Sequence, residues 1–324
     1  MKTHAIVSLF LVTLLATACT AQGESTGVPS ASAAAAAALH FQDEHTQWVR
    51  QRSADLGKPD GWTSLIGLHW IEAGKRSVGG GPDNAIRLSI APARLGEVEQ
   101  RADGLYFQVA AGVPVTVDGK PVQGDVRLDP EGAGGGTKLV YDEGRGQITA
   151  IKRGQRLALR VRHADAPARR DFAGLDFFPA DEGWRVKARF VAHPAGKTLP
   201  IVNVLGEVAD NPNPGYVVFE KEGHEWRLEA LGDPAKGLNL MFQDQSTGRL
   251  TYGVGRYLRT DPVAADGTVN IDFNRAHNPP CAYTEFATCP LPPPENRLVL
   301  QGADGARTRL AVLAGEKTYR SSTH

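Results

Sequence analysis

An excess of charge of one sign is missing from this sequence. Its 324 residues contain 36 Lys and Arg against 36 Asp and Glu, so the formal net charge is zero. A protein that binds nucleic acid usually carries a basic face that meets the phosphate backbone. The balanced composition therefore argues against nucleic acid as a partner.

Amphipathic helical patterns are also scarce. The best candidate is the segment from Phe41 to Leu56, where Phe41, Trp48, Val49 and Leu56 share one face. From Gly61 onward, β-type runs separated by Gly, Pro, Asp and Asn recur at intervals of about 8 to 12 residues, which is typical of a β-sandwich or barrel. We therefore predict a mainly β fold with one entry helix. The expected strands include residues 85–90, 105–110, 113–117, 138–141, 147–152, 157–162, 184–190, 201–205, 216–220, 224–230, 238–243, 250–252, 269–273, 297–300 and 308–313.

Motifs for metals, nucleotides and nucleophilic catalysis are absent as well. The nine histidines are scattered and none has H-E-x-x-H spacing, and neither G-x-S-x-G nor S-x-x-K occurs. Gly253 and Gly255 followed by Asp272 lack the third glycine of a dinucleotide fingerprint. We expect no cofactor and no metal, while a catalytic triad assembled from distant positions stays open.

Cysteine is rare, and the first of the three cysteines lies near the N-terminus. An apolar run from Ala5 to Leu15 and then Ala16-Thr17-Ala18 form the pattern of a bacterial export signal, and the run is too short to span a bilayer. Ordinary cleavage after Ala18 and lipoprotein processing at Cys19 are both compatible with this pattern. We favour the lipoprotein, exported and anchored in the membrane facing the periplasm. Because Thr20 rather than Asp follows Cys19, the outer membrane is expected in a Gram-negative host.

The remaining chain divides by composition. Residues 1–18 are the predicted signal peptide, and residues 19–38, rich in Ala, Ser, Thr and Gly, are expected to form a disordered tether behind the lipidated Cys19. Residues 39–172 are expected to form a domain of one helix and a β-sandwich. Residues 173–324 are expected to form a C-terminal antiparallel β-domain, a barrel or sandwich, that carries the functional site.

The stretch from Ser77 to Val126 resembles a forkhead-associated sandwich. The resemblance rests on a Gly-rich turn, on Pro82-Asp83-Asn84-Ala85-Ile86-Arg87-Leu88 and on Val117-Asp118-Gly119-Lys120-Pro121-Val122. Gly80 stands where the phosphothreonine-binding Arg of such modules would be, and residues 91–98 contain no Ser. The resemblance therefore implies a shape and not phosphopeptide binding.

The segment Asp272 to Leu298 is the most informative part of the chain. Its prolines forbid a regular helix or a central strand, and its Asn, Asp, Glu and Arg side chains are typical of a binding or catalytic loop. Within the loop, Cys281 and Cys289 are expected to form a disulfide after export, and a three-ligand metal site with His277 is the alternative. We predict that one pocket is lined by Asp244, Arg256, Asn274, Asn278, Glu295 and Arg297.

Four further motifs accompany this loop: Gly61-Trp62-Thr63-Ser64-Leu65-Ile66-Gly67-Leu68-His69-Trp70, Phe242 to Gly248, Thr251 to Leu258, and Ala314-Gly315-Glu316-Lys317. Together with the loop, they resemble the domain-of-unknown-function 1684 family of uncharacterised bacterial, archaeal and fungal proteins. His277 stands where the family more usually has Tyr. The resemblance implies a shared fold and site and assigns no reaction.

Two functions are compatible with these features. The first is a cell-envelope protein that binds a polar small ligand or an envelope partner through the Asp272 to Leu298 loop. The second is a hydrolase with paired carboxylates, Asp272 with Glu295 or Glu316, in which one acid is protonated and the other activates water. The polar side chains could also be purely structural, since Asn and Asp beside prolines often cap turns.

Overall fold

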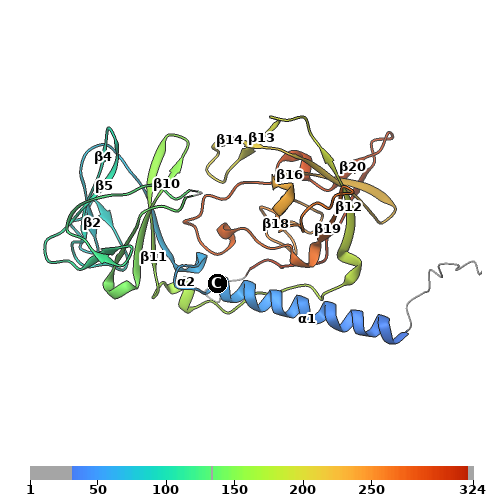
Figure 1. The fold of residues 1–324 in the computed structure, drawn as a ribbon, viewed down its shortest axis with the longest axis horizontal. Coiled ribbons are helices and arrows are strands. Elements are labelled where there is room, and N and C mark those ends of the chain that lie inside the picture. Colours follow the sequence, from blue (N-terminus) through green and yellow to red (C-terminus); the bar gives the residue numbers. More distant parts are fainter. Residues whose placement is uncertain (1–30, 133, 320–324) are drawn as a thin grey trace, which may run out of the picture.

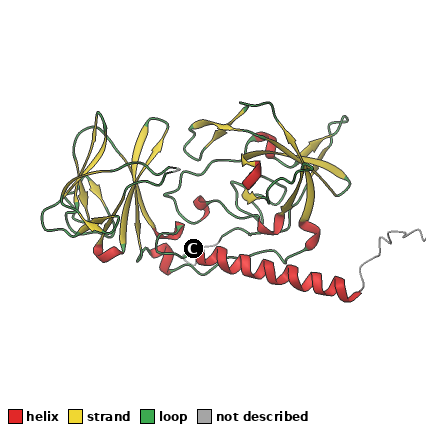
Figure 2. Cartoon of the chain, viewed as in Figure 1, coloured by secondary structure: helices red, strands yellow, loops and turns green. Residues whose placement is uncertain are grey.

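The computed structural model describes residues 31–132 and 134–319, and strands dominate them (Figure 2). The prediction of a mainly β protein is confirmed. The predicted signal peptide and Cys19 lie outside the described residues. The forkhead-associated resemblance stays a prediction.

The long helix α1 spans Ala31–Leu56 and begins earlier than expected. The predicted disordered tether is wrong from Ala31 onward, because the alanine run continues directly into the anchored part of the helix and alanine is the best helix former. Phe41 and Leu56 are buried. Gln42 and Glu44 contact Ala180 and Arg185, so α1 lies along the C-terminal part of the chain (Figure 1).

Two sheets enclose the first hydrophobic core. A six-stranded sheet has the order β1-β11-β10-β9-β6-β7, and a five-stranded sheet has the order β3-β2-β4-β5-β8. Val98 and Phe107 from the second sheet lie in one buried cluster with Leu139, Ile148 and Leu159 from the first. The strands are β1 Leu65–Trp70, β2 Arg76–Gly79, β3 Ile86–Arg87, β4 Gly96–Arg101, β5 Gly104–Val109, β6 Val115–Val117, β7 Lys120–Pro121, β8 Gly124–Arg127, β9 Lys138–Tyr141, β10 Gly146–Arg153 and β11 Arg156–His163, and a short helix, α2, follows at Pro167–Arg170.

The tight turn between β6 and β7 agrees with its sequence signal. Asp118 and Gly119 both have positive φ, at 51° and 73°. A two-residue hairpin turn of this kind needs positive φ at both positions, which Asp-Gly tolerates.

The second core belongs to a six-stranded antiparallel sheet of order β18-β17-β16-β15-β12-β19. In β12, the exposed Arg185, Lys187 and Arg189 alternate with the buried Val186 and Ala188, as the sequence predicts. The strands are β12 Arg185–Ala192, β13 Thr198–Val202, β14 Val208–Pro212, β15 Gly215–Lys221, β16 His224–Asp233, β17 Gly237–Phe242, β18 Arg256–Arg259, β19 Thr268–Asp272, β20 Val299–Gln301 and β21 Arg307–Arg309, of which β13-β14 and β20-β21 form two-stranded hairpins.

Two sequence-based assignments in this part were wrong or incomplete. Residues 250–252 were expected to form a strand, but Thr251 makes only an isolated bridge with Thr247 at the end of a turn. Strand β18 was missed, because it begins with the charged Arg256, whose side chain is nevertheless buried.

Candidate functional site

The loop from Phe273 to Leu298 joins β19 to β20, and it contains no regular helix or strand beyond three 3-10 turns. Isolated backbone bridges connect His277 to Tyr257, Pro290 to Asn203, and Arg297 to Gln243. The backbone of the loop is therefore attached at several points to the C-terminal part of the chain.

Asp244 and Arg256 form a buried ion pair rather than a ligand site. Arg256 Nη2 lies 2.9 Å from Asp244 Oδ2, and the two side chains are 1% and 0% exposed. Arg256 also donates to the carbonyl oxygens of Val312 and Ala314, while Asp244 accepts from the amides of Ser246 and Val312. Burial lowers the pKa of Arg256, and the Asp244 carboxylate opposes that shift. The pair ties β18 to the chain after β21.

Asn274 is a structural residue as well. Its Nδ2 donates to the carbonyl of Asp181 and to Asp272 Oδ1, both at 2.9 Å, and its Oδ1 accepts from the Asp181 amide at 3.0 Å. Asn274 is 1% exposed. It therefore fixes the start of the loop to the turn before β12.

Asn278 and Glu316 belong to a buried cluster beneath α1, which we call the Arg52 cluster, with Arg52 and Tyr283 as its other members. Glu316 accepts from Arg52 Nε and from the Asn278 amide, both at 2.8 Å, and from the Tyr283 hydroxyl. Asn278 Nδ2 donates to the Lys317 carbonyl, while its buried Oδ1 has no partner among the described residues. Although burial opposes the charge of Arg52, the Glu316 carboxylate raises its pKa. Sequence reasoning missed Arg52, because nothing in the pattern of α1 distinguishes it from exposed arginines.

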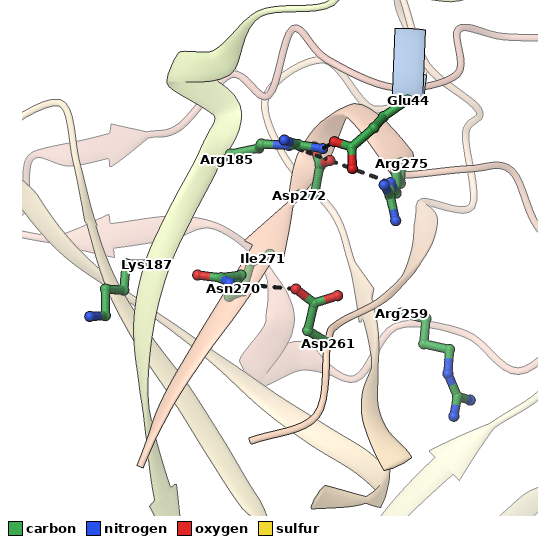
Figure 3. Close-up of a pocket in the computed structure, with 9 residues that line it drawn as sticks. All are labelled: Glu44, Arg185, Lys187, Arg259, Asp261, Asn270, Ile271, Asp272 and Arg275. Carbon is green, nitrogen blue, oxygen red and sulfur yellow. Dashed lines mark hydrogen bonds and ion pairs between the residues drawn. The ribbon is translucent and has the colours of Figure 1, made fainter. Parts of the chain in front are cut away.

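Asp272 lines a polar cavity of about 520 Å³, which we call the Asp272 cavity (Figure 3). Four basic and three acidic side chains contribute to its wall. Besides Asp272, the lining residues are Glu44 from α1, Arg185 and Lys187 from β12, Asn270 and Ile271 from β19, and Arg259, Asp261 and Arg275.

The Asp272 cavity has two polar sides. On one side, Arg185 Nε donates to Asp272 at 3.0 Å, Arg185 Nη2 donates to Glu44 at 2.7 Å, and Arg275 lies 3.4 Å from Asp272. On the other side, Asn270 lies 3.5 Å from Asp261 (Figure 3). Arg259 donates to the Lys236 carbonyl. Among the described residues, Lys187 has no ion-pair partner. The cavity thus presents charges of both signs, and neither Lys187 nor Arg259 forms an ion pair with a described residue.

Glu295 and Arg297 lie at the other end of the loop. Glu295 is exposed on a 3-10 turn, and Arg297 is exposed beside Gln243. Arg297 and Asp244 line a second cavity, of about 510 Å³. The six residues expected to line one pocket are therefore divided: Arg256, Asn274 and Asn278 are buried in structural contacts, Asp244 and Arg297 share the second cavity, and Glu295 is exposed.

Cys281 and Cys289 are free thiols in the structure, so the expected disulfide is not formed in it. The two residues are nevertheless neighbours, because the Cys281 amide donates to Cys289 Sγ at 3.0 Å. A hydrogen bond with Cys289 lowers the pKa of the Cys281 thiol to about 7.

His277 Nδ1 lies 3.1 Å from the Arg275 carbonyl. Across residues 31–132 and 134–319, no group of three His, Cys, Asp or Glu side chains is arranged to hold a metal ion. In that same part of the chain, no helix combines the length and the apolar character needed to cross a membrane.

Comparison with known protein families finds a match in the C-terminal part of the chain. Residues 170–317 match the family described as "Protein of unknown function (DUF1684)". The match does not reach Gly61 to Trp70, which sequence reasoning had included. An uncharacterized protein of Haloarcula marismortui, solved by solution NMR, is 31% identical over 47% of this chain and 80% of its own, with a TM-score of 0.37. No curated protein matches the chain.

Proposed function

The chain belongs to the DUF1684 family, and we propose that it is an exported envelope protein that binds a polar small ligand in the Asp272 cavity. The observation that carries the proposal is the lining of this cavity, which combines three carboxylates with four basic side chains. One of these, Lys187, forms no ion pair with any described residue. A cavity of a few hundred Å³ with convergent polar groups is the usual form of a small-ligand site. Charges of both signs suit a ligand that carries a carboxylate together with an amide, amine or hydroxyl group.

The alternative, a hydrolase with Asp272 paired to Glu295 or Glu316, has less support. Asp272 accepts from Arg185 and from Asn274, and Glu316 accepts from Arg52, Tyr283 and the Asn278 amide. Carboxylates with their oxygens engaged in this way act as scaffold or as ligand contacts more readily than as a general base, which needs a free lone pair facing water.

We expect a polar small molecule to co-purify with the native protein and to be lost on Lys187→Ala. Native mass spectrometry on gently purified protein measures the bound mass. Lys187 makes no ion pair among the described residues, so its removal should change the free energy of unfolding by less than about 0.5 kcal/mol.

Arg189→Ala is the matched control, because Arg189 lies two residues further along the same exposed face of β12 and does not line the cavity. Loss of the bound mass in both variants, or in neither, would contradict the proposal.

The proposed location rests on the lipobox-like sequence around Cys19. Lipidation of Cys19 would anchor the chain in the membrane with its β-domains in the periplasm. We expect Cys19→Ser to move the protein from the membrane fraction to the soluble periplasmic fraction. Metabolic labelling with palmitate should mark the native chain and not the variant. Equal labelling of both, or of neither, would exclude the anchor.

In an oxidising compartment we expect Cys281 and Cys289 to become a disulfide, each thiol giving up one proton and one electron to a disulfide of that compartment. The contact between the Cys281 amide and Cys289 Sγ supports this expectation. Closing the nine-residue loop would contribute about 2 to 3 kcal/mol. Thiol titration of exported Cys19→Ser protein without reductant should find no free thiol, whereas two free thiols would refute the bond.

A further inference from the structure

We infer that the second cavity, on the β20-β21 hairpin, is a binding site for a phosphate-bearing small molecule with two or more negative charges. We call it the arginine cavity. Its lining residues are Gln243, Asp244, Thr247, Gly253, Arg297, Val299, Gln301, Arg307 and Arg309. The inference does not depend on the Asp272 cavity, with which it shares no residue.

The register of the hairpin places Arg307 and Arg309 on one face. Val299 pairs with Arg309, and Gln301 pairs with Arg307. Because directly opposite residues of an antiparallel pair project to the same side, these four side chains share a face. Arg297, two residues before Val299, lines the same cavity. Leu298, between Arg297 and Val299, and Leu310, directly after Arg309, are buried in the core, which fixes the orientation of the hairpin.

The opposite wall is rigidly connected to this face. The Gln243 amide donates to the Asn296 carbonyl at 3.0 Å, and the Leu298 amide donates to the Gln243 carbonyl at 2.8 Å. The spacing between the wall at Gln243 and the start of β20 is therefore set by backbone hydrogen bonds. A site on a rigid scaffold needs little rearrangement to bind a ligand.

No described carboxylate neutralises the charges of the three arginines. Within the described residues, Arg297, Arg307 and Arg309 take part in neither an ion pair nor a side-chain hydrogen bond, and all three are exposed. The one carboxylate in the lining, Asp244, is engaged by Arg256 and by the Val312 amide. In a chain of zero net charge, the arginine cavity is thus a local concentration of unpaired positive charge.

Guanidinium groups select the chemistry of the ligand. Their paired N–H donors match the oxygens of phosphate and bind them bidentately, and several arginines around one cavity suit a group with more than one charge. The amide of Gln301 adds a donor and an acceptor for a neutral part of the ligand. The phosphate group could belong to a free small molecule or to a lipid headgroup, and the two sources can be separated by experiment.

Isothermal titration with inorganic pyrophosphate tests the free source. We expect saturable binding that weakens as the salt concentration rises. The double variant Arg307→Ala and Arg309→Ala should lose at least about tenfold in affinity, since each charge-assisted hydrogen bond to the phosphate oxygens contributes to the binding free energy. The control is Arg87→Ala with Arg189→Ala, which removes the same charge from exposed positions elsewhere.

Co-sedimentation of the Cys19→Ser chain with vesicles that contain cardiolipin, whose headgroup carries two phosphates, tests the lipid source. Vesicle binding that the Arg307 and Arg309 substitutions abolish would assign the phosphate group to a lipid, and pyrophosphate binding alone would assign it to a free molecule. The inference is overturned if neither probe binds, or if the control variant loses as much affinity as the hairpin variant.

Discussion

Glu316→Gln is expected to destabilise the fold by about 3 kcal/mol, because it leaves the Arg52 guanidinium without its counter-charge in a buried environment. Glu316 is 1% exposed and accepts hydrogen bonds from Arg52, Tyr283 and the Asn278 amide. Arg52→Met should cost a similar free energy, since the Glu316 carboxylate would then be unpaired. Urea unfolding followed by circular dichroism measures both effects.

A double-mutant cycle measures the interaction free energy between Arg52 and Glu316. If the two side chains interact directly, the cost of Arg52→Met with Glu316→Gln should be clearly smaller than the sum of the single costs. Arg50→Met is the matched control, because Arg50 is exposed on the same helix, and it should change stability by less than about 0.5 kcal/mol. Additive costs would mean that α1 is held by other contacts.

Elements of the fold could be predicted from the sequence where a few neighbouring residues determine them. The alternation of charged and apolar residues in β12 and the Asp118-Gly119 turn each depend on a few neighbouring residues, and both agree with the structure. Strand β18 could not be predicted, because the residues next to Arg256 do not indicate that its charged side chain is buried. This side chain is buried between Asp244, twelve residues earlier, and the carbonyls of Val312 and Ala314, which lie beyond β21 and more than fifty residues away.

The site was harder to predict, because carboxylates, amides and guanidinium groups serve as scaffold and as ligand contacts alike. Burial separates these roles, and burial depends on residues far away in the chain. Glu316 finds its partner Arg52 264 positions earlier. Arg307 and Arg309 were not predicted to be site residues. Only the pairing of β21 with β20 places them beside Arg297.

Acidification is expected to destabilise the protein through His277. Burial lowers the pKa of His277 to about 4 from its ordinary 6.5, and the nearby Arg52 charge adds to this shift, while Glu316 opposes it. Its ring packs against Trp48 and Tyr257. In the unfolded chain the imidazole takes up a proton near pH 6.5, whereas in the folded protein it stays neutral until about pH 4. The unfolded state therefore binds more protons in this window, and stability falls as the pH falls.

The expected size of the effect follows from the shift, since each pKa unit corresponds to 1.36 kcal/mol. Between pH 7 and pH 4 the native protein should lose about 3 kcal/mol more than His277→Phe, which keeps an aromatic ring against Trp48 and Tyr257 and cannot titrate. Urea midpoints measured for both proteins across this range give the difference, and comparison at each pH cancels the carboxylates that both share. Parallel stability curves for the two proteins would show that His277 takes up its proton in the folded state as readily as in the unfolded state. That result would contradict a neutral, buried His277.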